Sequence, residues 1–259
     1  MNPKDIFLYL LGNRNSIERV AATPKAWIVG AILVLTAGIA RNYDHLDLVR
    51  QFEWFIGPFA ASIFSALFIY GWTCFFLRPG SLGKHRNQFP IFVNLFWLTA
   101  PCAWVYGIPV ESFTDIVTAT KWNIGFLAVV SIWRIAVIVR AISILGNIVW
   151  YRVLPVILAP ASIEMFFGSN FKRLSLIGIM GGVRLPPESQ LLLKATEFTQ
   201  VVSFWIFIGS LIACFLTKGR MDTPFSRRRV PIPYPTIVVA TISLISWLAL
   251  AISYPYWGF

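Results

Sequence analysis

Residues 124–150 read IGFLAVVSIWRIAVIVRAISILGNIVW, an almost unbroken apolar run that is interrupted by two arginines, Arg134 and Arg140. About 20 consecutive apolar residues are enough for a helix to cross the hydrocarbon core of a bilayer. This run is longer than that, so it predicts a membrane-spanning helix rather than a buried helix of a soluble domain.

The rest of the chain has the same apolar character. Its 259 residues are 57% hydrophobic and 13% charged, whereas a soluble domain carries about 25% charged residues. The alternating segments of about ten residues that mark a transmembrane β-barrel do not occur. We therefore predict an all-α fold, a polytopic transmembrane helical bundle of about seven spans. The apolar segments lie at residues 26–40, 55–77, 89–109, 124–150, 153–168, 198–216 and 236–256.

Residues 1–25 precede the first span and have a mixed composition. Apolar residues recur at helical spacing from Ile6 to Leu11, and Gly12-Asn13 interrupts the pattern before Asn15 or Ser16 caps a second short helix. This pattern predicts an N-terminal interfacial amphipathic segment. The predicted domains are a cytosolic or interfacial segment at residues 1–25 and a single transmembrane helical domain at residues 26–259.

The fifth apolar segment, 153–168, is short for a span and contains Pro155, Pro160 and Glu164. It is either a kinked span or a re-entrant hairpin. Lys- and Arg-rich loops prefer the cytoplasmic side, and the basic loop at residues 217–234 lies on the same side as the N-terminus only if this segment crosses. The basic residues of the longest loop, 169–197, argue the other way. On balance we predict seven spans in a bacterial cytoplasmic membrane, with the N-terminus on the cytoplasmic side.

Arg134 and Arg140 are the most informative polar residues of the chain. In a regular helix each lies about 14 Å from one end of the run 124–150, where a charge costs at least about 2.5 kcal/mol unless it is paired or hydrated. Six residues correspond to about 120° of rotation, which predicts separate partners. Glu164 is the candidate partner, either in a structural ion pair or in a site for an anion, a lipid headgroup or a proton.

Residues 41–53 gather polar side chains at the membrane surface. Asp44, His45 and Asp47 have the ligand types of a divalent metal site, but their spacing matches no known site, and a solvated loop is the simpler interpretation. The second histidine, His85, falls on the opposite side of the predicted topology, which argues against a shared haem or metal. We predict neither a cofactor nor a bound metal.

A polybasic cluster, Arg227-Arg228-Arg229, precedes the last span. Next to a span such a cluster is typical of contact with anionic lipid headgroups. The net charge of +11 is explained in the same way, because the basic residues stand mostly in short loops beside apolar runs. The predicted partners are membrane lipids and possibly other membrane proteins, and nucleic acid is not expected.

Two stretches carry a resemblance to known proteins. One runs from Asn15 to Asp44 and ends in Ala40-Arg41-Asn42-Tyr43-Asp44. The other runs from Leu98 through Pro101 and Ile108-Pro109-Val110-Glu111 to Arg134. Both resemble a group of bacterial polytopic membrane proteins of unassigned function, and the N-terminal segment entering a first span distantly resembles the Yip1-type membrane proteins. The resemblance implies a helical membrane protein and brings no catalytic or binding residues with it.

Three functions remain open at this stage. Short loops and the lack of a nucleophile elbow, a phosphate-binding loop or a metalloprotease motif favour a non-enzymatic accessory or scaffold component of the membrane. The alternative is a transporter or channel-like protein for a small anion or lipid, with Arg134, Arg140 and Glu164 along its path. A membrane-embedded lipid-modifying enzyme that uses Asp44, His45 and Asp47 is the second alternative.

Overall fold

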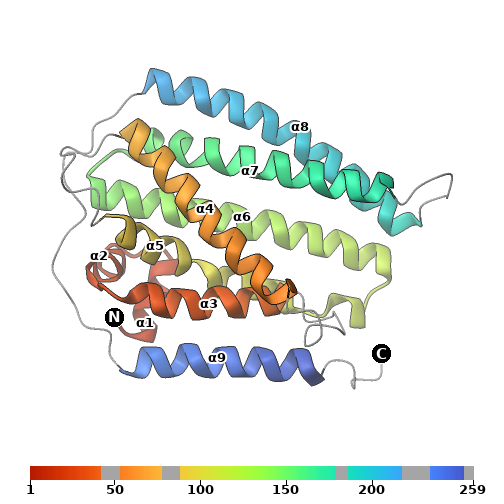
Figure 1. The fold of residues 1–259 in the computed structure, drawn as a ribbon, viewed down its shortest axis with the longest axis horizontal. Coiled ribbons are helices and arrows are strands. Elements are labelled where there is room, and N and C mark those ends of the chain that lie inside the picture. The colour runs from red at the N-terminus through yellow and green to blue at the C-terminus, as the bar shows by residue number, and fades with distance from the viewer. Residues whose placement is uncertain (42–52, 78–87, 179–185, 218–233, 254–259) are drawn as a thin grey trace.

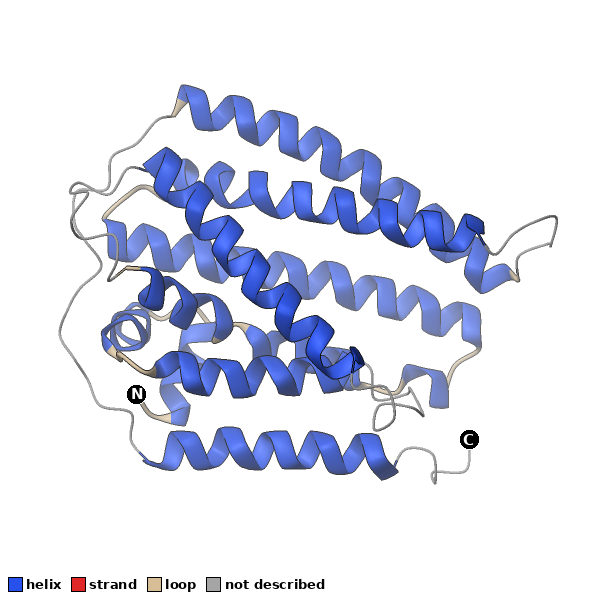
Figure 2. Ribbon diagram, in the orientation of Figure 1, coloured by secondary structure: helices blue, strands red, loops and turns tan. Residues whose placement is uncertain are grey.

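The chain folds into helices that run alongside one another (Figures 1 and 2). The computed structural model describes residues 1–41, 53–77, 88–178, 186–217 and 234–253, and no strand occurs among them. The elements are α1 (Pro3–Leu10), α2 (Arg14–Ala22), α3 (Ala26–Arg41), α4 (Glu53–Leu77), α5 (Phe89–Trp97), the 3₁₀ helices η2 (Ala100–Gly107) and η3 (Val110–Ser112), α6 (Ile116–Gly146), α7 (Trp150–Gly178), α8 (Pro187–Leu216) and α9 (Tyr234–Ser253).

Five segments among the described residues are long and apolar enough to cross a membrane. The prediction of an all-α chain with several membrane-spanning helices is therefore confirmed, and five of the seven predicted segments have the length of a span. The first and last predicted spans correspond to the shorter apolar helices α3 and α9. The five segments are Ile56–Leu77, Phe89–Ser112, Ile116–Gly146, Trp150–Asn170 and Pro187–Leu216.

The outer surface of the bundle is apolar, as expected of a protein whose solvent is lipid. Only 17% of the α8 span is buried inside the protein, and it exposes large apolar side chains such as Phe198 and Trp205. A soluble monomer rarely exposes so much contiguous apolar surface. In a bilayer the same surface is the expected boundary with acyl chains.

The ends of α6 differ from the predicted run 124–150. The helix begins at Ile116, after the side chain of Asp115 accepts a hydrogen bond of 2.9 Å from the Thr118 amide. It ends at Gly146, followed by Asn147 in the left-handed conformation with φ of 49°, which asparagine adopts more readily than most residues. The shift moves Arg134 toward the middle of the helix and Arg140 toward its end.

The fifth segment is one continuous helix, α7, with Pro155 and Pro160 inside it. Its apolar part, Trp150–Asn170, is long enough to cross a membrane, so the re-entrant alternative is wrong. Proline is tolerated inside membrane helices because neighbouring helices and local adjustments satisfy the freed backbone groups. The predicted long loop 169–197 is wrong as well, since α7 extends to Gly178 and α8 begins at Pro187.

Helices α7 and α8 form an antiparallel pair (Figure 1). In the sequence, Pro186-Pro187 and Glu188 predict the start of a helix, and α8 does begin at Pro187 and continues without a break into the sixth span. The pair is joined across its interface by a hydrogen bond of 2.7 Å from the Gln200 amide to the Asn170 side-chain oxygen. An amide–amide bond of this kind helps to fix the register of two helices that otherwise pack through apolar contacts.

The N-terminal residues are built into the bundle. The helices α1 and α2 form a hairpin that turns at Gly12, whose φ is +74°, and the cap of α2 is Asn13 rather than Asn15 or Ser16. Tyr9 is 0% exposed, whereas Phe7 on the same helix is 63% exposed. The amphipathic segment is therefore not confirmed as a separate interfacial element, because one face of α1 belongs to the core.

Tyr9 anchors this hairpin to the third span. Its hydroxyl donates a hydrogen bond of 2.6 Å to the backbone oxygen of Leu95 in α5, and burial raises the pKa of Tyr9, so the phenol stays protonated and remains a donor. A second contact joins the same elements, since the Asn94 amide donates to the backbone oxygen of Thr23 at 2.7 Å. The start of α3 and the end of α5 are thereby held together.

We expect Tyr9→Phe to destabilise the protein, because it leaves the buried oxygen of Leu95 without its donor. An unsatisfied buried acceptor costs about 1–3 kcal/mol, which corresponds to a Tm lowered by several degrees in a chain of this size. Thermal unfolding in detergent measures the change. The matched control is Tyr151→Phe, because Tyr151 is half-exposed. An equal Tm for both variants would contradict the role of Tyr9.

Candidate functional site

The α-helix of the third span breaks off in the middle, where the span continues as a 3₁₀ helix and the backbone amides of Leu98 and Thr99 stay hydrogen-bonded. Helix α5 ends at Trp97, and the chain continues through Leu98 and Thr99 into the 3₁₀ helix η2. Pro101 lacks a backbone donor, and the Thr99 hydroxyl bonds the Phe96 backbone oxygen at 2.6 Å, so both residues disfavour a continuous α-helix here. This span is 61% buried, the highest share of the five. Irregular backbone at membrane depth is tolerated where protein surrounds it.

Arg134 of α6 lies at this break. Its Nε donates a hydrogen bond of 3.0 Å to the hydroxyl of Thr99, and its guanidinium carbon lies 5.2 Å from the ring centroid of Phe96. The side chain is half-buried. Within the described part of the chain it forms no ion pair, and its two terminal nitrogens have no hydrogen-bond acceptor. A guanidinium has five donors, so most of its capacity is unused.

Glu164 of α7 lies at the same depth as Arg134. The end of α6 and the start of α7 meet at one end of the bundle, and with a rise of about 1.5 Å per residue Arg134 lies about 18 Å and Glu164 about 21 Å from it. The Ser65 hydroxyl of α4 donates a hydrogen bond of 2.8 Å to Oε2 of Glu164. The other oxygen, Oε1, is buried without a partner among the described residues.

The predicted ion pair between Arg134 and Glu164 is not formed. Among the described residues, ion pairs join only Arg14 to Glu18 and Arg19 to Asp5, all in the N-terminal hairpin. Arg134 and Glu164 are close enough for their charges to interact, but each one contacts a hydroxyl instead of the other. The site thus contains two opposite charges at one depth, neither of them neutralised by direct contact.

Arg140 has a different role from Arg134, in keeping with the predicted separate partners. It is exposed near the end of α6, and its Nε donates to the backbone oxygen of Gly12. It lies nearer the end of its helix than the run 124–150 indicated, because α6 ends at Gly146 rather than 150. A Cβ atom at residue 12 would lie 2.6 Å from Cδ of Arg140, so the close contact depends on glycine in the turn. Arg140 therefore holds the hairpin and is not part of the buried site.

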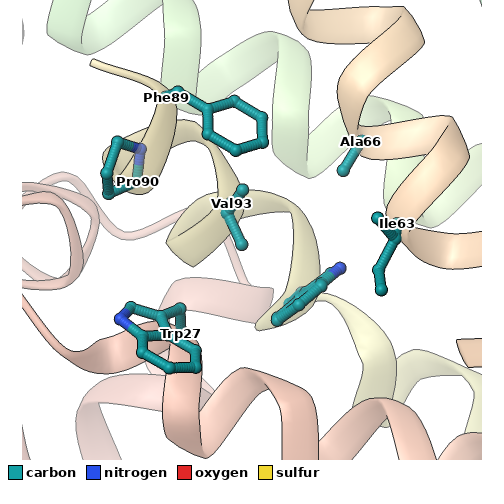
Figure 3. A pocket seen from close by; sticks show the side chains of 7 residues that line it. Trp27, Ile63, Ala66, Phe89, Pro90 and Val93 are labelled. Carbon is teal, nitrogen blue, oxygen red and sulfur yellow. The ribbon is translucent and has the colours of Figure 1, made fainter. Parts of the chain in front are cut away.

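Helix α5 also contributes to an apolar pocket of about 300 Å³ (Figure 3). Because successive helix residues are about 100° apart, Phe96 beneath Arg134 and Trp97 at the pocket face different neighbours. No polar atom contributes to the pocket wall, which therefore suits hydrocarbon and not the charged end of a ligand. The lining residues are Trp27 of α3, Ile63 and Ala66 of α4, and Phe89, Pro90, Val93 and Trp97 of α5.

Two groups of predicted site residues lie outside the described residues. These are the polar cluster Asp44, His45 and Asp47 and the basic cluster Arg227, Arg228 and Arg229, and both stay predictions. In the part of the chain that the structure describes, no group of three or more His, Cys, Asp or Glu side chains could hold a metal ion.

Sequence reasoning missed the residues that hold the two charges. Thr99 and Ser65 are single hydroxyls in apolar runs, and nothing in their own segments distinguishes them from structural threonine and serine. One signal was present, because Pro101 follows Thr99 in the middle of a predicted span and predicts a break. No known protein family matches the chain, and neither does any curated protein or solved structure.

We expect Arg140→Met to loosen the N-terminal hairpin while leaving the rest of the bundle intact. The variant keeps an unbranched side chain but removes the donor to Gly12. Losing this hydrogen bond should cost about 1 kcal/mol, so the equilibrium population of the open hairpin should rise about fivefold. Hydrogen–deuterium exchange of residues 3–22 measures it. The control is Arg152→Met, since Arg152 is also exposed. Unchanged protection of the hairpin would show that this contact does not hold it.

Proposed function

We propose that the protein is a membrane transporter for a small solute or lipid headgroup that carries an anionic group, and that Arg134 binds this group. One observation carries the proposal. Arg134 lies in the middle of a helix that is long and apolar enough to cross a membrane, beside the change from α-helix to 3₁₀ helix between α5 and η2, and its terminal nitrogens have no partner within the described residues. A charge inside a membrane span is a functional hypothesis by default, and irregular helices near mid-membrane are frequent places of substrate sites in transporters.

A purely structural role accounts less well for the arrangement. An arginine that only fixes packing is expected in a closed ion pair, because an unpaired charge at mid-membrane costs at least about 2.5 kcal/mol. Within the described residues Glu164 bonds Ser65 and forms no ion pair with Arg134. An anionic ligand would fill the unused donors of Arg134 and supply the missing counter-charge.

We infer further that the chain crosses the membrane seven times with its N-terminus inside. Support comes from the directions of the helices, since α3, α6, α7, α8 and α9 run alongside one another, α4 crosses them obliquely, and successive long helices alternate in direction (Figure 1). The Thr36 hydroxyl of α3 accepts a hydrogen bond of 2.8 Å from Trp104 of η2, so α3 packs on the third span along its length. The basic segments 1–25 and 217–234 then fall on the side of the N-terminus, as the positive-inside rule prefers, whereas the basic residues of the segment 169–197 fall on the other side.

The accessory or scaffold function remains the second candidate. The observation in its favour is the surface of α8, the least buried of the five spans, which is available to a protein partner as much as to lipid. The two functions predict different results for Arg134. A scaffold that docks through α8 does not depend on this residue for partner binding, whereas a transporter depends on it for flux.

We expect Arg134→Gln to abolish anion binding and flux. Purified protein in proteoliposomes is assayed for uptake of propionate and ethyl phosphate and for transbilayer movement of a fluorescent phosphatidylglycerol. A hydrogen bond to a charged group contributes about 1.5–3 kcal/mol, so affinity should fall at least about tenfold. Arg134→Lys should retain part of the affinity, and the exposed Arg152→Gln should retain all of it. Equal flux in Arg134→Gln and the unmodified protein would exclude transport through this residue.

We expect the two ends of the chain to lie on opposite sides of the membrane. Green fluorescent protein folds inside bacterial cells, whereas alkaline phosphatase is active outside them. Fusions at residue 83 should fluoresce, and fusions at residue 259 should show phosphatase activity. Fluorescence from the C-terminal fusion would mean an even number of crossings, with α3 or α9 not spanning.

A further inference from the structure

The geometry points to a zwitterion as the ligand, one that pairs a carboxylate or phosphate with an ammonium group. The anionic group binds Arg134, and the ammonium group binds Glu164. This inference rests on the proposed function and adds the substrate class to it.

The first argument is the state of the two charged groups. Thr99 occupies only Nε of Arg134, which leaves the two terminal nitrogens that bind a carboxylate or phosphate in the bidentate manner. Ser65 occupies only Oε2 of Glu164, which leaves Oε1 buried without a partner among the described residues. Each hydroxyl therefore bonds one atom of its charged partner, and the atoms that a ligand would bind stay without a partner.

The second argument is their relative position. Arg134 and Glu164 lie at the same depth on α6 and α7, which pack against each other, and among the described residues no ion pair joins them. Their charged groups are therefore on adjacent helices and separated by more than an ion-pair distance. A small molecule with both charges can bridge such a gap and satisfy both groups at once.

The third argument is the charge balance at low dielectric. A plain anion would neutralise Arg134 but would lie beside the carboxylate of Glu164, and like charges repel strongly where water is excluded. A plain cation would neutralise Glu164 but would be repelled by Arg134 in the same way. A zwitterion adds no net charge to the site, so its entry into the membrane interior is opposed least.

Two sources can supply this chemistry, a free amino acid and the headgroup of phosphatidylethanolamine. The experiment uses a matched pair of probes for each. Alanine is compared with propionate, which lacks the ammonium group, and phosphoethanolamine is compared with ethyl phosphate. Binding to the purified full-length protein in detergent is measured by ligand-dependent thermal stabilisation. Preference within the first pair identifies an amino acid, and preference within the second pair identifies the lipid headgroup.

We expect the unmodified protein to bind the zwitterion of one pair at least tenfold more tightly than its matched anion. Glu164→Gln should remove this preference by weakening the zwitterion and strengthening the anion, and Glu164→Asp should restore part of it. Arg134→Gln should lose both ligands. Glu188→Gln, at the start of α8, is the control and should behave as the unmodified protein. Anion binding that persists in Glu164→Gln also shows that this variant is folded.

The inference and the proposed function fail in different ways. If the anion binds as tightly as the zwitterion in both pairs and Glu164→Gln changes nothing, the zwitterion inference is overturned, while loss of the anion in Arg134→Gln still supports the proposed function. If none of the four probes stabilises the unmodified protein, the zwitterion inference is overturned as well.

Discussion

The hydrogen bond from Arg134 to Thr99 is the contact on which the centre of this bundle depends. It lies where the third span changes from the α-helix α5 to the 3₁₀ helix η2. A charged side chain inside a bilayer is unfavourable unless it finds a partner, because no water is present to satisfy it. The hydroxyl of Thr99 supplies one acceptor, and the ring of Phe96 lies beneath the guanidinium. Both residues stand at the change of helix type, which therefore positions the contacts of the buried charge.

A second constraint shapes the end of the bundle where the chain begins. Short helices leave carbonyl groups without partners at their C-termini, and here side chains from distant segments supply the donors. Tyr9 donates to Leu95, Asn94 to Thr23 and Trp133 to Leu10, each at 2.6–2.8 Å. Further bonds of the same kind run from Arg140 to Gly12 and from Thr236 to Met1. These bonds replace water at the helix ends, which is why the N-terminal hairpin is part of the core.

Sequence patterns predicted the helical class, the apolar segments and the start of α8, because these follow from composition and from local signals such as Pro187. They failed where the outcome depends on tertiary contacts. Hydropathy does not distinguish burial in protein from exposure to lipid, so it does not show that Tyr9 is buried whereas Phe7 is exposed. Hydropathy also marks the apolar part of a helix and not its ends, which placed Arg140 farther from the end of its helix than it is. The pairing of Arg134 required the rotation of two spans about their axes, and one sequence does not determine that rotation.

The apolar residues of α5 help to explain why a polar site can exist inside so apolar a chain. Phe96 packs its ring beneath Arg134, and Phe89, Val93 and Trp97 line a pocket whose wall exposes no polar surface. The ring adds a cation–π contact to the guanidinium, which is stronger where water is scarce. Loss of that ring would remove this contact even with Thr99 in place. The site therefore depends on an apolar residue as much as on its two polar groups, and the low dielectric around them is the physical basis of the selectivity that we propose for a ligand of opposite charges.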